Sequence, residues 1–397
     1  MTERVVLVFN AGSSTIKFGL FARDAPRPRP LARGGVDLRR RPLLLRIEEG
    51  AQVIELPLQT ATADDLQPIV AEILDWLAGH FDTPDIAAVG HRVVHGGDRF
   101  AGPAAITAQT LAAIDALVPL APLHQPQNLR LIRAIGALRP ALLQVASFDT
   151  AFHRSQSDLV RRFALPRRYF DEGVKRYGFH GLSYQFIAAR LAEVAPEVAA
   201  GRVVVAHLGS GASLCALEAG VSRDTSMGFS TLDGVPMATR PGALDPGVLI
   251  HLLKSGGLSV EALEDMLYHR SGLLGVSGLS ADSRDLLASA APEAREALDL
   301  FTFRIAREVT ALANTIGGLD GIVFTAGIGE HQPQIRQAVC HRLAWLGVTI
   351  DADANAGNAT RIDAVASRIA VFVLPTDEEQ VIAQEACHVL AGETSQR

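Results

Sequence analysis

One local pattern occurs twice in this chain, about half its length apart. Residues 4–21 and 202–217 each contain an apolar run rich in β-branched residues, then a turn of small residues, then a second apolar run. Each run is typical of a β-strand and each turn of a strand connection. When Gly12 is aligned with Gly209, the strand, small-residue turn and strand coincide in the two segments. The repeat therefore predicts a duplicated domain.

The other predicted elements alternate between helices and strands. They are a surface loop at 24–34, helices at 64–79 and 301–316, strands at 321–324 and 369–374, a turn at 326–330, and a final helix whose capped start is at 375–379. Gly317 and Gly318 mark the end of the helix before them. Strands alternating with helices predict the α/β class.

Composition limits the kind of protein and its compartment. A chain of 397 residues with 48% hydrophobic residues is large enough for two or three domains with their own cores. The balance of 37 basic and 43 acidic residues argues against a nucleic-acid-binding face. The sequence has no apolar run of 18 residues and no secretory signal pattern, so we expect no membrane partner.

Cysteine usage points to a reducing compartment. Cys215, Cys340 and Cys387 are odd in number and far apart, with no CxxC pair. Neither a disulfide framework nor a cysteine zinc site fits this spacing, and we expect a cytoplasmic protein.

Three small-residue turns are the first chemical signal. Residues 10–15, 208–211 and 327–329 each follow an apolar run. Backbone N–H groups in such turns can approach a phosphate closely. Any one of these turns alone is better explained as an ordinary tight turn, but three in a chain with similar halves favour a nucleotide-phosphate site. The P-loop, Rossmann and protein-kinase motifs are absent from the sequence.

Two arginines stand among glycine and apolar residues rather than in charged surface runs. Arg92 lies in GHRVVHGG and Arg240 in MATRPG. Such arginines suit bidentate binding of a carboxylate or phosphate, and the alternative for each is a structural ion pair.

For several single acidic and histidine residues, the sequence is compatible with either a functional or a structural role. Asp149 follows a buried-type strand, which suits either a magnesium-linked carboxylate or a helix N-cap. His180 could be a catalytic residue or a core histidine. His91 and His95 have the spacing of a helical zinc pair, but the valines between them indicate a strand.

With these residues in view, the chain resembles the acetate kinase family, within the superfamily of acetate and sugar kinases, heat-shock proteins and actin. The resemblance covers almost the whole sequence. It rests on motifs in the family's order at 8–17, 90–97, 121–124, 148–153, 176–181, 207–213, 224–229, 239–240, 245–246, 268–278, 324–330 and 375–379.

The resemblance implies a two-lobed fold, each lobe ribonuclease H-like as in the actin-like ATPases, with an active-site cleft between the lobes. Residues 1–150 and the C-terminal helix 380–397 would form the acyl and phosphoryl lobe, and residues 151–379 the nucleotide-binding lobe. It also implies a homodimer. The implied reaction is reversible, magnesium-dependent transfer of phosphate from ATP to a short-chain carboxylate, with Mn²⁺ as an alternative metal.

Individual roles carry over by the same resemblance. Arg92 and Arg240 would hold the carboxylate and the phosphoryl group, and His180 would hydrogen-bond the latter. Asn10, Asp149 and Glu378 would serve the metal, with Asp149 an orienting residue rather than a base. The acyl pocket would comprise Val94, Leu123, Phe179 and Thr231. The nucleotide and its phosphates would contact Ser13, Thr15, Lys17, His207, Leu208, Gly209, Ser210, Gly211, Asp282, Ser283, Arg284, Gly327, Ile328, Gly329 and His331. His124 matches a family histidine to which the sequence assigns no role.

Some positions depart from the family pattern. Tyr184 replaces a usual His, and Ser210 and His331 each replace an Asn near the nucleotide. Thr231 stands where many members have Pro. These departures leave nucleotide preference open. Val94 is bulkier than an Ala that would admit longer acids, so acetate is favoured over propionate, although one methylene is worth only about 1–3 kcal/mol.

Two other functions remain as alternatives. A sugar kinase of the same superfamily would need Asp149 as a true base and would not need carboxylate-binding arginines. A non-catalytic ATP-binding module would need neither. The paired arginines favour the carboxylate kinase.

Overall fold

The computed structural model describes residues 4–12, 15–23, 27–62, 65–81 and 85–392. The chain divides into two compact units. Unit 1 contains residues 1–152 and 377–397, and unit 2 contains residues 153–376. Among the described residues, no helix is long and apolar enough to cross a membrane.

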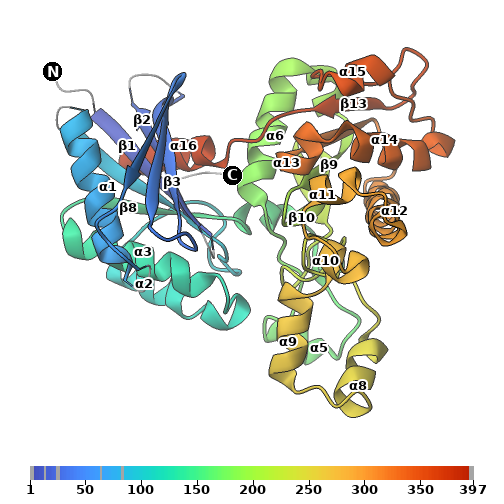
Figure 1. The fold of residues 1–397 in the computed structure, drawn as a ribbon, viewed down its shortest axis with the longest axis horizontal. Coiled ribbons are helices and arrows are strands. Elements are labelled where there is room, and N and C mark those ends of the chain that lie inside the picture. Colours follow the sequence, from blue (N-terminus) through green and yellow to red (C-terminus); the bar gives the residue numbers. More distant parts are fainter. Residues whose placement is uncertain (1–3, 13–14, 24–26, 63–64, 82–84, 393–397) are drawn as a thin grey trace. The chain divides into compact units, whose positions relative to one another are not determined.

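An eight-stranded mixed sheet forms the centre of unit 1 (Figure 1). Its order is β5 (Gln52–Pro57), β4 (Leu44–Glu49), β3 (Arg29–Asp37), β2 (Thr15–Ala22), β1 (Arg4–Ala11), β6 (Asp85–Val93), β8 (Leu143–Phe148) and β7 (Ala104–Ala105). The strands β1, β6 and β8 are parallel, whereas β2 runs antiparallel to β1. The parallel strands therefore end at one edge of the sheet.

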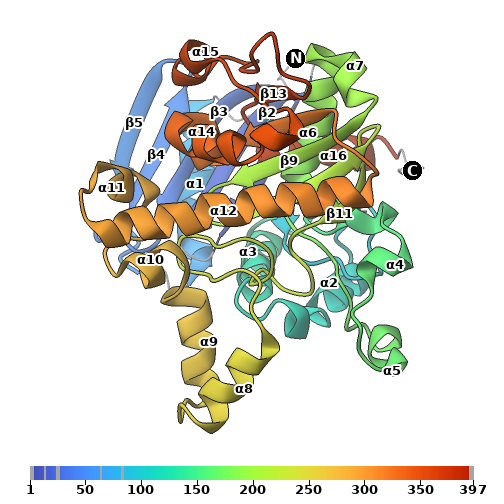
Figure 2. The same cartoon turned by 90° about the vertical axis from the view of Figure 1, so that its right-hand side faces the viewer.

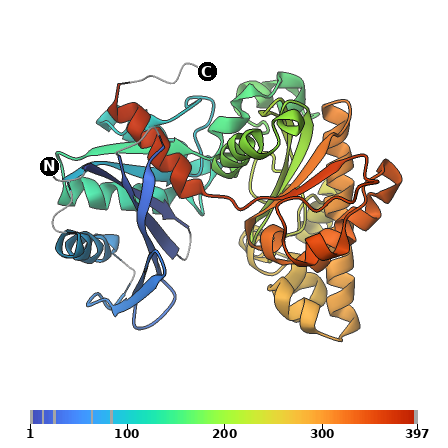
Figure 3. The ribbon, with the colours of Figure 1, turned by 90° about the horizontal axis from the view of Figure 1, so that it is seen from above.

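Helices cover both faces of this sheet. The core between the sheet and one layer of helices contains apolar residues of α1 (Leu66–His80) and α3 (Gln125–Leu138). The last helix, α16 (Glu378–Leu390), packs against β1, β6 and β8 (Figure 3). Gly90 of β6 permits this contact, because a Cβ there would lie 2.6 Å from Ile382 Cγ2. Unit 1 also contains α2 (Ala108–Asp115) and the 3₁₀ turn η1 (Val118–Leu120).

Unit 2 is built on a five-stranded mixed sheet. Its order is β11 (Val221–Thr225), β10 (Ala212–Glu218), β9 (Arg202–Leu208), β12 (Gly321–Thr325) and β13 (Ala370–Val373). The strands β9, β12 and β13 are parallel, and β10 is antiparallel to β9.

The helices of unit 2 differ in length and burial. The longest, α12 (Pro292–Thr315), contacts β9, β10 and β11 (Figure 2). The 3₁₀ turn η2 (Ala151–Ser155) spans the unit boundary in sequence. The others are α4 (Asp158–Arg161), α5 (Arg167–Asp171), α6 (Gly181–Val194), α7 (Pro196–Ala199), α8 (Pro246–Lys254), α9 (Val260–His269), α10 (Gly272–Ser277), α11 (Ser283–Ala288), α13 (Ala326–His331), α14 (Pro333–Arg342), α15 (Ala352–Ala356) and the 3₁₀ turn η3 (Ala344–Leu346).

The duplication read from the sequence is visible in the sheets. The strand order β3-β2-β1-β6-β8 in unit 1 matches β11-β10-β9-β12-β13 in unit 2, with the same parallel and antiparallel neighbours. The predicted α/β class with two copies of one fold is therefore confirmed. The functional roles predicted for the two lobes stay predictions.

Two local predictions are wrong. The loop expected at 24–34 ends earlier, because β3 begins at Arg29 and pairs with β2; Pro30 is accommodated where the pairing register shifts. The turn expected at 326–330 is the helix α13, whose first amide, from Ala326, donates to Glu330 Oε1 at 2.8 Å.

Candidate active site

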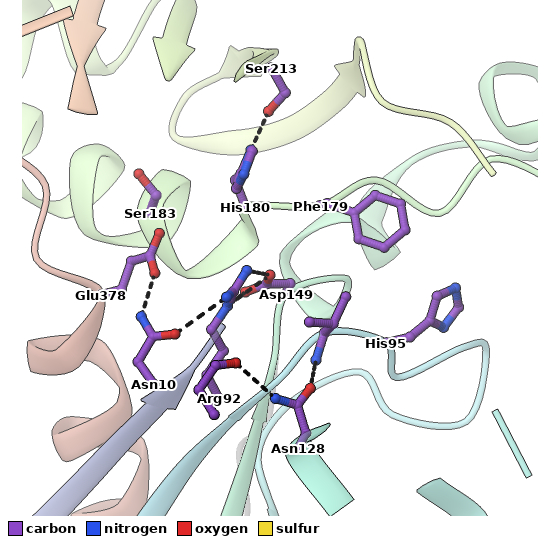
Figure 4. Close-up of polar contacts among 12 residues, drawn as sticks. Asn10, Arg92, His95, Asn128, Asp149, Phe179, His180, Ser183, Ser213 and Glu378 are labelled. Carbon is purple, nitrogen blue, oxygen red and sulfur yellow. Dashed lines mark hydrogen bonds and ion pairs between the residues drawn. The ribbon is translucent and has the colours of Figure 1, made fainter. Parts of the chain in front are cut away.

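Four polar side chains of unit 1 meet where its parallel strands end (Figure 4). Asn10 is near the end of β1, Arg92 is near the end of β6, and Asp149 directly follows β8. Glu378 is the first residue of α16, the helix that packs on those strands. Ligand sites of α/β sheets lie at the carboxyl ends of the strands, and the fold brings these residues to that edge.

Arg92 and Asp149 form a bidentate ion pair. Arg92 Nη2 donates to Asp149 Oδ2 at 2.6 Å, and Arg92 Nε donates to the same carboxylate at 3.0 and 3.2 Å. Burial by itself would lower the pKa of Arg92, but the carboxylates of Asp149 and Glu378 outweigh it and raise this pKa above its usual value. The guanidinium therefore stays charged. Arg92 forms the ion pair that the sequence analysis gave as the alternative to ligand binding.

Asn10 links this pair to Glu378. Its Nδ2 donates to Glu378 Oε2 at 3.0 Å, and its Oδ1 accepts from Arg92 Nη1 at 3.3 Å. Lys17 lies opposite Asn10 in the β1–β2 register and is exposed. Thr15 begins β2, and its carbonyl accepts from the Gly12 amide. Ser13, which we predicted to contact phosphate, lies outside the described residues.

Asn128 is a site residue that the sequence analysis missed. It is buried in α3, where it accepts from the Val94 amide and donates to the Ala11 carbonyl, both at 3.1 Å. One side chain thus fixes the ends of both β6 and β1. The available signal was a polar residue within the apolar stripe of a helix.

His91 and His95 do not form the helical pair considered as a zinc site. His91 lies in strand β6, stacked on Phe9, and its Nε2 is 2.8 Å from the Gln144 amide. His95 lies after the strand, and its Nδ1 accepts from the Gly97 amide at 3.0 Å. Both are core histidines flanking Arg92 and Val94.

In unit 2 a second group of residues meets at the turn between β9 and β10. A Cβ on Gly211 would lie 2.6 Å from Arg240 Nη2 and 3.6 Å from His180 Nε2, so only glycine leaves room for these groups. Arg240 is half-buried, and its Nη1 donates to the Thr231 carbonyl at 2.8 Å. No described carboxylate forms an ion pair with it, and burial lowers its pKa. A guanidinium without a carboxylate, facing a small-residue turn, is suited to an anionic ligand.

His180 and His207 form a stacked pair beside this turn. Their ring centroids are 4.2 Å apart with planes inclined by 16°. His207 lies one residue before the end of β9, and its Nδ1 lies 2.8 Å from Ser183 Oγ. His180 adopts a left-handed backbone conformation with φ of 57° at the start of α6. A bulky residue in that region is strained, and such residues gather at functional sites.

The remaining predicted nucleotide residues of unit 2 occupy three short segments. Leu208 is the last residue of β9, and Gly209, Ser210 and Gly211 form the turn to β10. Asp282 caps α11 and pairs with Arg284, while Ser283 is buried and accepts from Gln332 Nε2. On α13, Gly327 is exposed, Ile328 is partly buried and the His331 side chain is 73% exposed. Gly329 instead packs inside, because its Cβ position lies 3.3 Å from the Phe324 backbone.

The predicted acyl-pocket residues divide between the units. Val94 is buried in unit 1, whereas Leu123 is 40% exposed; Phe179 is buried in unit 2 and Thr231 is partly exposed. His124 precedes α3 as its N-cap residue, without a side-chain capping bond.

Comparison with known proteins identifies the family. The model of the Acetokinase family matches residues 5–384. Among curated proteins, acetate kinase from Rhodopseudomonas palustris strain TIE-1 is 48% identical over 98% of this chain and 99% of its own length. Acetate kinase from Rickettsia prowazekii is 39% identical over 97% of this chain and 99% of its own length.

Solved structures agree with the sequence relatives. A propionate kinase from Francisella tularensis has a TM-score of 0.90 and 34% identity, covering 97% of this chain and 99% of its own. Acetate kinase from Porphyromonas gingivalis has a TM-score of 0.87 and 36% identity, covering 98% and 100%. The fold and family define a phosphotransferase of the actin-like ATPase class. The chain belongs to the acetokinase family, which confirms the resemblance, the fold class and the enzyme class predicted from its sequence.

Three buried histidines make the free energy of unfolding of the protein depend on pH. Burial lowers the pKa of His91, His95 and His153 to about 4. These imidazoles are neutral in the folded chain, but in the unfolded chain they bind protons below a pKa of about 6.5. The free energy of unfolding should therefore be fully present above pH 6.5 and decrease as the pH falls toward 4. Each histidine contributes up to about 1.4 kcal/mol per pH unit.

Denaturant titrations of the wild type and His91→Gln between pH 4.5 and 7.5 test this prediction. The free energy of unfolding of His91→Gln should depend less steeply on pH than that of the wild type, by about one proton. The exposed His388→Gln variant controls for the loss of an imidazole. An unchanged slope in His91→Gln would contradict the neutral assignment.

Proposed function

We propose that this chain transfers the terminal phosphate of ATP to acetate, giving ADP and acetyl phosphate, and catalyses the reverse reaction. The observation that carries the proposal is Arg240, a half-buried guanidinium beside Gly211 and His180 with no carboxylate partner among the described residues. Such a group favours the binding of a phosphoryl anion.

The chemistry needs charge neutralisation more than a base. A carboxylic acid with a pKa near about 4 is already ionised at neutral pH, so the nucleophile is formed before it binds. The barrier then comes from bringing two anions in line and from the charge on the transferring oxygens. Arg92, Arg240 and a hydrogen bond from His180 address both requirements.

The position of Asp149 favours this reaction over sugar phosphorylation. Both of its oxygens accept from Arg92, so removing a proton from a sugar hydroxyl would require breaking the ion pair. Asp149 therefore acts in our proposal as the residue that holds Arg92 toward the acceptor carboxylate.

The donor set at the end of the unit 1 sheet fits a magnesium ion. Asn10, Asp149 and Glu378 present amide and carboxylate oxygens, the ligands that Mg²⁺ prefers, and Mn²⁺ accepts the same set. A bound ion would neutralise charge on the phosphate groups of ATP. On the nucleotide side we assign the phosphates to Lys17 and the 207–211 turn, and adenosine to Asp282, Arg284, Gly327 and Ile328.

Acetate is the acceptor that we favour over propionate. The buried Val94 limits the space for a longer chain. The similarity to a propionate kinase of known structure makes propionate the alternative acceptor to test first. We assign the enzyme to the cytoplasm, where ATP is available and its three free cysteines would stay reduced.

We further propose a homodimer formed through α8 and its flanking residues. Within the described part of unit 2, α8 has no buried residue. Its apolar side chains are therefore open to solvent, with Val248 44% and Ile250 53% exposed. Leu244 before the helix and Val260 at the start of α9 are also exposed. Figure 2 shows α8 and α9 extending away from the unit 2 sheet. A second copy covering this apolar group would bury it.

Hydroxylamine trapping of acyl phosphate tests the proposed reaction. With ATP and magnesium, acetate should give the strongest signal, propionate a weaker one and butyrate the weakest. The same incubations with glucose, followed by ADP release, test the sugar-kinase alternative. ATP binding without acyl phosphate from any of the three acids would refute the proposal.

Removal of the Arg240 guanidinium should abolish turnover without preventing ATP binding. We expect Arg240→Ala to lower kcat by at least about 100-fold, the typical cost of losing one donor to a transition-state anion. Arg190→Ala removes a surface arginine of the same unit and should behave as wild type. Near-normal turnover of Arg240→Ala would be inconsistent with the assigned role.

A charge within the apolar α8 group should separate the dimer. Ile250→Asp should sediment as a monomer at concentrations where the wild type is a dimer, because a carboxylate would be buried without a partner. Val365→Asp, at another exposed valine of unit 2, is the matched control and should remain dimeric. A dimeric Ile250→Asp would exclude this interface.

A further inference from the structure

The first turn of α6 holds an imidazole through two hydroxyl groups. Tyr184 is fully buried, and its hydroxyl lies 2.5 Å from Ser213 Oγ on β10. The same Ser213 oxygen lies 2.8 Å from His180 Nδ1 (Figure 4). His180, Tyr184 and Ser213 belong to unit 2. A continuous chain of hydrogen bonds, which we call the relay, therefore runs from Tyr184 through Ser213 to His180.

The buried tyrosine determines the direction of these hydrogen bonds. Among the described residues, Ser213 Oγ is the hydrogen-bond partner of the Tyr184 hydroxyl. Burial raises the pKa of Tyr184 well above its usual value, so the hydroxyl keeps its proton. That proton must be donated to Ser213, because a buried donor without an acceptor loses its hydrogen bond to water and gains none in return.

Ser213 then has one hydroxyl proton to donate, and one neighbouring group remains that could accept it. Ser213 is itself fully buried, and its other partner is His180 Nδ1. If His180 carried a proton on Nδ1, two donors would point at Ser213 Oγ and its own hydroxyl proton would have no acceptor. The network is satisfied only when His180 Nδ1 accepts from Ser213.

We propose that Tyr184 and Ser213 are positioning residues that fix His180 as the neutral tautomer protonated on Nε2. This leaves the Nε2–H as a donor facing the Gly211 turn, where Arg240 Nη2 also lies. The two ring nitrogens of a histidine are set apart by the hydrogen bond that each one makes. The relay thus converts a residue that could donate or accept into a fixed donor for an anionic oxygen.

The ring plane is held independently of the relay. His180 stacks on His207, whose Nδ1 lies near Ser183 Oγ, and Ser183 Oγ lies 2.8 Å from Thr376 Oγ1. Ser183 and Tyr184 are adjacent on the first turn of α6, so this turn contacts His207 directly and reaches His180 through Ser213. Loss of the relay should therefore change the proton position more than the ring position.

The tautomer can be measured without any assay of activity. In ¹⁵N-histidine-labelled protein, the signals of His180 are assigned by their loss in His180→Asn. We expect wild-type His180 to show a protonated Nε2 and an unprotonated Nδ1. Ser213→Ala removes the donor to Nδ1, so this variant should show a mixture of tautomers. Tyr184→Phe removes only the competing donor to Ser213 Oγ, so it should show a smaller but measurable share of the form protonated on Nδ1.

The catalytic consequence rests on the proposed function and is tested separately. Since one typical hydrogen bond is lost, Tyr184→Phe should lower kcat about twofold to twelvefold and leave the KM for ATP and acetate nearly unchanged. Tyr177→Phe removes another buried tyrosine hydroxyl of unit 2, one that donates to the Gly173 carbonyl, and should retain wild-type kcat.

A double-mutant cycle separates positioning from general structural damage. In a His180→Ala background, Tyr184→Phe should cause no further loss of kcat, because the relay has no imidazole to orient. An equal loss in both backgrounds, a wild-type His180 protonated on Nδ1, or an unchanged tautomer in Tyr184→Phe would each overturn the proposal. If no acid is phosphorylated at all, the labelled spectra still decide it.

Discussion

The ion pair between Arg92 and Asp149 organises the end of the unit 1 sheet. A guanidinium in this position would be costly without a partner, and the bidentate carboxylate keeps it charged and directed. Asn10 then connects the pair to Glu378, so that three strands and a helix from the far end of the chain hold one polar group. Removal of Asp149 would leave Arg92 without its ion-pair partner and release the contact that orients it.

Arg240 shows the opposite arrangement, and the contrast gives the two arginines different roles in the proposed reaction. Its hydrogen-bond partner is a backbone carbonyl, and burial lowers its pKa. A cation in this state gains most when an anion arrives, whereas Arg92 already has its carboxylate. In the proposed reaction, Arg92 suits an acceptor that must be held in place, and Arg240 suits the phosphoryl group on which charge builds up.

Sequence reasoning found what is local or repeated, and missed what depends on contacts distant in the chain. Apolar spacing predicted α1, and the repeated strand, turn and strand predicted the duplication, whereas the common strand order became known only from the structure. The helix α13 was read as a turn because its first amide is satisfied by Glu330, a side-chain contact that composition does not show. Asn128 and the Tyr184–Ser213 contact were missed for the same reason, since each joins different elements of the fold. Arg92, Arg240, Asp149 and the small-residue turns were candidates from the sequence pattern, whereas their individual roles and the remaining site residues came from the family resemblance.

The duplication also accounts for the different chemistry of the two turns. The alignment of Gly12 with Gly209 places Asn10 of β1 at the position of His207 in β9. In unit 1 this position joins carboxylates and a paired arginine, a set of oxygen donors that favours a cation. In unit 2 it joins imidazoles, hydroxyls and an arginine without a carboxylate, a set of donors that favours an anion. Because each set includes a residue at the same position of the repeated strand, different side chains on a common framework are sufficient, in the proposed reaction, to direct one copy toward a metal ion and the other toward a phosphoryl group.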